Sequence, residues 1–244
     1  MNPEILALLT IGIFLVALLY SSVGHAGASG YIAVMSLLSV APTTIKPTAL
    51  VLNILVASIG VLQFWRAGHF SWRLFWPFSI LSIPLAFLGG YISLPAEILK
   101  LVLGIVLLYS AAHFFMRPPI ENDPKAPPRS LALVIGGGIG FLSGLTGTGG
   151  GIFLTPLLLI MNWATARNAA AVSALFILVN SIAGLLGNIS STRQFPAFAL
   201  VLVVAAGFGG IIGSYLGSRR FNPLQIKRFL AVVLLIAGCK LILT

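Results

Sequence analysis

Charged side chains are scarce in this chain of 244 residues, and acidic ones are the scarcest. Fourteen residues are basic and four are acidic, so that only 7% are charged and the formal net charge is +10. Soluble domains carry about 25% charged residues, whereas 59% of this chain is hydrophobic. So little polarity cannot cover a surface that faces water. The composition excludes an ordinary soluble protein and predicts an integral protein of the lipid bilayer.

Other absences narrow the chemistry. A single cysteine, Cys239, excludes an intrachain disulfide and a thiolate metal cluster. All four acidic residues fall at expected helix ends or in a linker, so no carboxylate is placed in mid-membrane to coordinate a cation, relay protons or hydrolyse a glycoside. The sequence has no HExxH zinc motif, and its three histidines lie far apart. We therefore expect no metal, no cofactor and no enzymatic activity.

The basic residues stand singly or in short groups between apolar runs. A nucleic-acid surface needs basic residues gathered on one exposed face, so we expect no nucleic-acid partner. Lysine and arginine between apolar segments instead determine which side of the membrane each loop occupies.

Uncharged stretches outline the membrane spans. The longest, 5–45 and 130–166, contain 41 and 37 residues without Lys, Arg, Asp or Glu. A helical span needs about 20 apolar residues, so each of these two stretches holds two segments. The predicted helices are 5–23, 28–41, 47–66, 73–93 and 96–116, followed by 131–145, 150–163, 168–188, 195–217 and 223–243.

Both long stretches are interrupted by glycine-rich breaks, at 24–30 and 144–151. Aligning Gly30 with Gly151 also aligns Lys46 with Arg167, which indicates an internal repeat. The predicted organisation is a first transmembrane repeat (1–116), a proline-rich cytoplasmic linker (117–130) and a second transmembrane repeat (131–244).

The basic residues favour one topology. If all ten segments cross the membrane, ten basic residues share one side and four share the other; if the short helices 28–41 and 150–163 do not cross, the division is seven and seven. The positive-inside rule favours the first arrangement. Five crossings per repeat make the repeats inverted, with both termini outside. The expected fold is an all-α polytopic membrane protein of two inverted repeats of about five helices, each with a glycine-broken short helix, an architecture typical of secondary transporters.

The glycine breaks are the candidate binding site. Backbone amides at a helix N-terminus attract an anion without side-chain charge, and glycine lets the backbone approach a ligand closely. Polar side chains in the breaks and within the spans would supplement them. The predicted substrate-binding residues are His25, Gly27, Ser29, Gly30, Asn53, Ser58, Thr146, Thr148, Gly149, Gly150, Gly151, Asn180 and Ser181.

Structural roles remain open for the same residues. Glycines also permit close helix packing in membranes, and buried Asn or Ser can join helices by hydrogen bonds. Lys46 and Arg167, at the starts of equivalent helices, can extend to the headgroups or attract an anion towards a pore mouth.

The two halves and their breaks resemble the TauE/SafE family of sulfite exporters over essentially the whole chain. The stretch 144–156, Gly-Leu-Thr-Gly-Thr-Gly-Gly-Gly-Ile-Phe-Leu-Thr-Pro, is similar to the family's most recognisable segment. The stretch 22–30 matches less closely, since His25 and Ala28 depart from the glycine-richer form.

The resemblance implies a multi-pass permease of the bacterial inner membrane for a small sulfur-containing anion, sulfite or an organosulfonate. We expect the permease to translocate this anion by alternating access. The alternatives are an anion channel and a non-transport assembly or enzyme component of the membrane. The sequence leaves the anion, the direction of transport, the coupling ion and the oligomeric state open.

Overall fold

The described residues of the computed structural model, 3–92, 108, 111–112, 124–193 and 197–243, form helices joined by turns and contain no strand. The expectation of an all-α polytopic protein is confirmed for this part of the chain. The third expected span of the first half, 96–116, and most of the linker 117–130 lie outside the described residues.

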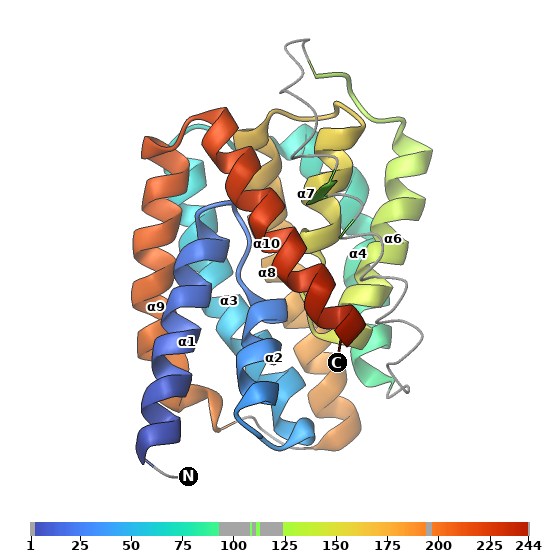
Figure 1. The fold of residues 1–244 in the computed structure, drawn as a ribbon. Helices are drawn as coiled ribbons and strands as arrows, with labels where there is room; N and C mark the ends of the chain where they lie inside the picture. Colours follow the sequence, from blue (N-terminus) through green and yellow to red (C-terminus); the bar gives the residue numbers. More distant parts are fainter. Residues whose placement is uncertain (1–2, 93–107, 109–110, 113–123, 194–196, 244) are drawn as a thin grey trace.

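Nine α-helices and one π-helical turn make up the described part of the bundle (Figure 1). In chain order they are α1 (Pro3–Ser21), α2 (Ala28–Leu37), α3 (Pro42–Arg66), α4 (Trp72–Tyr91), α6 (Arg129–Thr146), α7 (Gly151–Ile160), α8 (Ala166–Thr192), α9 (Ala199–Tyr215), η1 (Leu216–Arg220) and α10 (Pro223–Leu243).

Six of these helices are long and apolar enough to cross a bilayer: α1, α3, α4, α6, α8 and α9 with η1. Their outer faces carry large apolar side chains, as on α1, where Leu8, Ile11 and Leu15 are half exposed while Leu9 and Ile13 are fully buried. A helix that is apolar on both faces can contact lipid on one side and protein on the other.

The two short helices are shorter than the sequence suggested. α2 ends at Leu37 rather than at residue 41, and α7 occupies 151–160 rather than 150–163. Each has ten residues, a length of about 15 Å at the usual helical rise, which is half of a hydrocarbon core of about 30 Å. Each short helix therefore reaches from the interior to one end of the molecule.

Each short helix folds back beside the long helix that precedes it. In Figure 1, α1 runs upward from the N-terminus and α2 returns to the same end, whereas α6 runs downward and α7 returns to the opposite end. The amide of Lys125 donates to the carbonyl of Asn162, which joins the segment before α6 to the turn after α7. The two hairpins thus enter the molecule from opposite ends.

Glycine stripes bring helices of the two halves into close contact. Glycines spaced four residues apart on α6 lie against α4 so closely that a β-carbon would clash with its backbone; the pairs are Gly136 with Phe78, Gly140 with Ser82 and Gly144 with Ala86. An equivalent stripe that runs from α9 into η1 lies against α1 and the residue after it, in the pairs Gly209 with Phe14, Gly213 with Leu18 and Gly217 with Ser22. Both offsets are constant, so each helix pair is parallel, as close packing through small residues permits.

The helices α3 and α8 occupy the centre. The most apolar 18-residue stretches of these two helices are 56% and 67% buried, the highest values among the six long helices. Their inward faces contain the polar residues Asn53, Asn180 and Ser181, none of which is exposed. Because both breaks pack against these central helices, α3 and α8 position the candidate site.

Candidate functional site

The second break is a tight loop between α6 and α7. Gly147, Gly149 and Gly150 all have positive φ, at 75°, 78° and 80°. Residues that carry a β-carbon rarely adopt this conformation. A β-carbon on Gly149 would lie 2.8 Å from Asn53 Nδ2 and 2.9 Å from Ser181 Oγ. The glycine sequence is therefore required here both by the backbone conformation and by the approach of neighbouring side chains.

Two central helices hold polar side chains against this loop. The Asn53 amide on α3 donates from Nδ2 to the carbonyl of Thr148, at 3.3 Å, and to Ser181 Oγ on α8, at 3.4 Å. Asn53 and Ser181 have no exposed surface. The structure thus brings four predicted residues together: Asn53, Thr148, Gly149 and Ser181.

Unsatisfied polar groups surround the start of α7. Gly150 is the N-cap of this helix, and no side chain caps it. Asn53 Oδ1 and the hydroxyl of Ser143, on α6 beside Gly150, are buried and have no hydrogen-bond partner among the described residues. Since buried polar atoms normally have a partner, this arrangement is typical of a place where a ligand or water completes the hydrogen bonds. We call Asn53, Ser143, Thr148, Gly149, Gly150 and Ser181 the central polar site.

The two threonines of the break interact with each other. Thr146 Oγ1 donates to the carbonyl of Leu142 and lies 2.9 Å from Thr148 Oγ1. Both side chains are partly exposed. The Thr148 hydroxyl therefore retains hydrogen-bonding capacity at the border of the central polar site.

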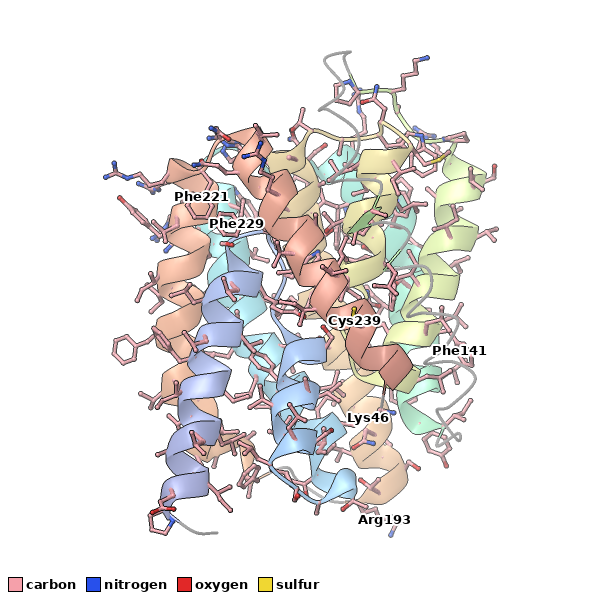
Figure 2. All side chains as sticks on the ribbon, in the orientation of Figure 1. Lys46, Phe141, Arg193, Phe221, Phe229 and Cys239 are labelled. Carbon is pink, nitrogen blue, oxygen red and sulfur yellow. The ribbon has the colours of Figure 1, made fainter. Side chains whose placement is uncertain are left out.

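Lys46 approaches the same break from the start of α3. A β-carbon on Gly147 would lie 2.9 Å from Lys46 Cγ, so the lysine stem lies along the loop. Figure 2 shows Lys46 and Arg193 towards the same end of the bundle, opposite Phe221. This places a cationic side chain beside the second break, which sequence reasoning considered only as an alternative to extension towards the headgroups.

The first break meets the second half through His25. Its side chain is 3% exposed, and Nε2 lies 2.9 Å from Thr155 Oγ1 on α7. The Thr155 hydroxyl donates in turn to Ser173 Oγ on α8, at 2.7 Å. The Thr155 oxygen therefore accepts from His25 Nε2–H, and His25 Nδ1 is left as a buried acceptor without a partner among the described residues.

The other predicted residues of the first break contact α1. Gly27 has φ 103° and is the N-cap of α2, without a side-chain cap. Ser29 Oγ donates to the Tyr20 hydroxyl at 3.0 Å, and a β-carbon on Gly30 would lie 2.5 Å from Val16 Cγ1. These three residues lie against α1 rather than beside the central polar site.

Three further candidates are not part of the central polar site. Ser58 is exposed on the outer face of α3 and donates to the carbonyl of Ile54 in its own helix. Asn180 joins helices: its Nδ2 donates to the carbonyl of Phe176, and its Oδ1 accepts from Ser82 on α4. Gly151, the first residue of α7, packs against Ile177 of α8.

Sequence reasoning missed Ser143, Thr155 and Ser173. Each is a hydroxyl with no polar side chain next to it in the sequence, and each is at most 1% exposed. The spacing of Thr155 four residues after Gly151 puts it one turn inside α7, a signal that a search of the helix faces could have used.

A polar cluster closes the opposite end of the bundle. Arg167 Nη2 donates to the carbonyl of Phe221 at 2.8 Å, and Asn168 Nδ2 donates to the carbonyl of His69 at 2.9 Å. His69 Nε2 lies 3.2 Å from the carbonyl of Ser218. In the loop 67–71, burial lowers the pKa of His69; the Ser218 carbonyl opposes this shift, and the nearby Arg167 charge adds to it. We call Arg167, Asn168, His69, Ser218 and Phe221 the end cluster.

The described residues contain no group of three or more His, Cys, Asp or Glu side chains that could hold a metal ion. The central polar site instead offers hydroxyls, amides and a nearby lysine. These are groups that bind an anion.

Comparison with known proteins identifies the family. The sulfite exporter TauE/SafE family matches residues 9–241. A probable membrane transporter protein of Sinorhizobium fredii is 44% identical over 239 residues, 96% of this chain and 97% of its own length. A probable membrane transporter protein of Bacillus subtilis is 30% identical over 97% of this chain and 99% of its own length. No solved structure matches the chain. The apolar helices, the glycine breaks and these relatives together show that the chain belongs to the TauE/SafE family and is a multi-pass membrane transporter.

Proposed function

We propose that this transporter carries a small sulfur oxyanion, sulfite or an organosulfonate, across the bacterial inner membrane, and that the central polar site binds it. The observation that carries this proposal is the buried start of α7, which lacks a side-chain cap. A helix start of this kind supplies free amides and a positive dipole end, and both favour an anion.

The charge of the surroundings supports an anionic substrate. Glu4, in the first turn of α1, is the only carboxylate side chain among the described residues, so no acidic group within the described bundle would repel an anion. Lys46 beside Gly147 adds an attractive charge on the approach to the site. Sulfite is preferred within this class because the family is named for sulfite export.

The packing of the helices supports alternating access. Helix α1 packs on α9 of the other half, and α6 packs on α4, while α3 and α8 contact each other at the centre. Exchanging the two halves turns the contact of α1 with α9 into the contact of α6 with α4 and turns the contact of α3 with α8 into itself, as inverted repeats would require. In transporters built from inverted repeats, one bundle of helices rocks against another around a central substrate site. We propose that α1 moves together with α9 and α4 together with α6, because close glycine contacts join each pair across the two halves.

Uptake of radiolabelled sulfite into proteoliposomes tests this function with a matched pair of variants. Ser181→Ala removes a hydroxyl from the central polar site, and Ser58→Ala removes the same atom from the outer face of α3. A lost hydrogen bond to a charged ligand costs about 1.5–3 kcal/mol, so Ser181→Ala should raise the KM for sulfite about tenfold to a hundredfold. Ser58→Ala should transport as the wild type does. Equal KM values in all three proteins would overturn the proposed site.

Exchange separates a carrier from a channel. If alternating access operates, unlabelled sulfite inside the vesicles should accelerate uptake of labelled sulfite, and uptake should saturate. Uptake that rises linearly with concentration and is not accelerated in this way would show an anion channel instead. Absence of sulfite transport, with transport of another solute, would replace the proposed substrate.

A further inference from the structure

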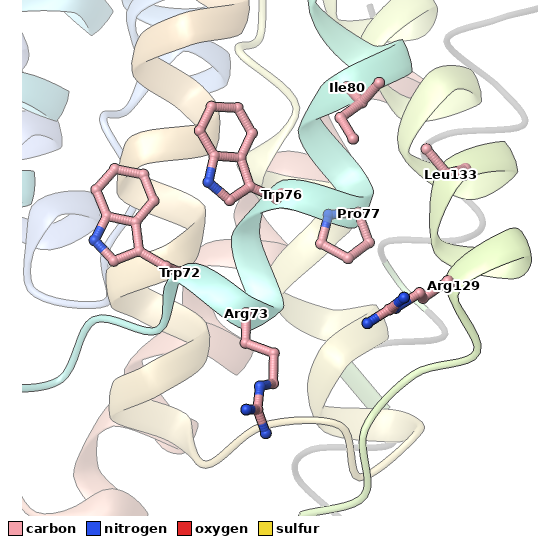
Figure 3. A pocket seen from close by; sticks show the side chains of 7 residues that line it. All are labelled: Trp72, Arg73, Trp76, Pro77, Ile80, Arg129 and Leu133. Carbon is pink, nitrogen blue, oxygen red and sulfur yellow. The ribbon is translucent and has the colours of Figure 1, made fainter.

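A groove on the outer face of the bundle is built from residues other than those of the central polar site. It is formed where α4 and α6 begin side by side, has a volume of about 400 Å³, and is shown in Figure 3. It is lined by Trp72, Arg73, Trp76, Pro77, Ile80, Arg129 and Leu133. We propose that this groove binds one anionic phospholipid.

The groove combines positive charge with aromatic side chains near the starts of the two helices. Arg73 and Arg129, one from each helix, are both exposed. Figure 3 shows Trp72 and Trp76 on one side of α4, and the Arg129 side chain extending from α6 towards α4. Tryptophan side chains concentrate at the level of lipid headgroups, and arginine binds phosphate oxygens in a bidentate manner. The end of the groove at the starts of the two helices therefore fits a phosphodiester headgroup.

The other end of the groove, further along the two helices, is apolar. Ile80 is 55% exposed on α4, and Leu133 faces it from α6 in Figure 3. Continuing along the same two helices, Leu81, Leu88 and Val134 are also exposed. A free inorganic anion would use only the arginines, whereas a phospholipid would use both the arginines and this apolar surface.

The surrounding charges favour an anionic lipid over a zwitterionic one. Glu4 is the only carboxylate side chain among the described residues. It lies in α1 at the opposite end of the bundle, where Figure 1 places the N-terminus. A choline headgroup would bring a cation next to two arginines, while a glycerol headgroup would not. Basic pockets between transmembrane helices bind anionic headgroups in this way.

The rigid walls of the groove suit a bound lipid. Gly136 and Gly140 hold α6 against Phe78 and Ser82 beside the groove, so that the spacing of the two helices is fixed. The bound lipid would join the starts of α4 and α6, two helices from different halves of the chain.

Native mass spectrometry of the purified full-length protein tests the proposal. Phosphatidylglycerol and phosphatidylcholine are titrated against the wild type, Arg73→Gln/Arg129→Gln and the control pair Arg220→Gln/Arg228→Gln. The control removes the same charge from exposed side chains of η1 and α10. Each arginine near a headgroup contributes roughly a fivefold change in affinity, so the groove variant should bind the first phosphatidylglycerol about 30-fold more weakly. The wild type and the control should retain that binding and its preference over phosphatidylcholine.

Three outcomes would overturn the proposal. The first is equal weakening in the control pair, which would show attraction by net charge alone. The second is equal affinity of the wild type for the two lipids. The third is displacement of phosphatidylglycerol by millimolar glycerol 1-phosphate, which would show a site for a soluble anion. A Trp76→Leu variant provides an independent check: it leaves the charge unchanged and should also weaken phosphatidylglycerol binding.

Discussion

His25 Nε2 lies 2.9 Å from Thr155 Oγ1, and this hydrogen bond joins the break before α2 to α7, one turn after the start of that helix. The two residues are 130 positions apart in the chain and belong to different halves. Through Ser173, which accepts from Thr155, the same chain of hydrogen bonds reaches the central helix α8. The two halves of the transporter are therefore linked at the level of their breaks by a buried polar chain.

Thr155→Val should destabilise the protein by removing the middle hydroxyl of the hydrogen-bonded series His25, Thr155 and Ser173. Valine has nearly the same shape but removes the hydroxyl that bonds both His25 and Ser173, and the loss of a buried hydrogen-bond partner costs about 1–3 kcal/mol. The expected result is a lower Tm of the detergent-solubilised protein. Thr10→Val is the control, because the Thr10 hydroxyl only donates to Leu6 of its own helix. Equal Tm values for the two variants would argue against a structural role of the chain.

Two glycines of α6 should respond in opposite ways to alanine. Gly140→Ala places a methyl group against the backbone of Ser82 and should cost about 1–3 kcal/mol through overpacking. Gly138 faces open space, so Gly138→Ala should leave stability unchanged or raise it by up to about 1 kcal/mol through helix propensity. Chemical denaturation of both variants measures the difference. A stable Gly140→Ala protein would contradict the close contact of α4 and α6.

Lys46→Gln should weaken the attraction of the anion towards the central polar site. Steering charges change association rates by about tenfold or more, so the KM for sulfite should rise roughly threefold to tenfold at low ionic strength. The difference from the wild type should shrink in high salt because salt screens the charge. Arg193→Gln, at the same end of the bundle, is the control. An equal increase for both variants would assign the effect to the surface charge as a whole.

The end cluster should make stability depend on pH. The pKa of His69 is lower in the folded protein than its usual 6.5, so the unfolded state binds the proton more readily. The contribution of neutral His69 to stability is present above about pH 6.5 and is lost as the pH falls through the folded pKa. Tm should therefore decrease between pH 7.5 and pH 5, and His69→Gln should show a smaller decrease. An identical pH profile in the variant would remove His69 as the titrating group.

Both termini should face the periplasm, with the linker in the cytoplasm. Reporter fusions after Thr244 and within 117–130 measure this directly. In Figure 1, α1 rises whereas α6, the corresponding helix of the second half, descends, which agrees with halves of opposite orientation. A linker reporter on the periplasmic side would reject the inverted five-plus-five topology.

Much of this molecule could be predicted from its sequence. Scarcity of charge and long apolar runs required a membrane protein, because these residues cannot cover a surface that faces water. The start of α10 at Pro223 and the ends of α3 and α4 near Arg66 and Tyr91 followed within two residues from proline, glycine and charge. The two breaks were visible as glycine clusters because positive φ angles such as that of Gly150 require glycine.

Only the tertiary structure decided which polar residues meet. Ser58 and Ser181 looked equivalent in the sequence, yet one is exposed on the outer face of α3 and the other contacts Asn53 beside Gly149. A single hydroxyl in an apolar helix gives no period from which its direction can be predicted, so its partner depends on how neighbouring helices are rotated. The same holds for His25, whose partner Thr155 lies in the other half of the chain. Local sequence determines where helices begin and break, whereas contact between distant helices determines which of their side chains can bind a substrate.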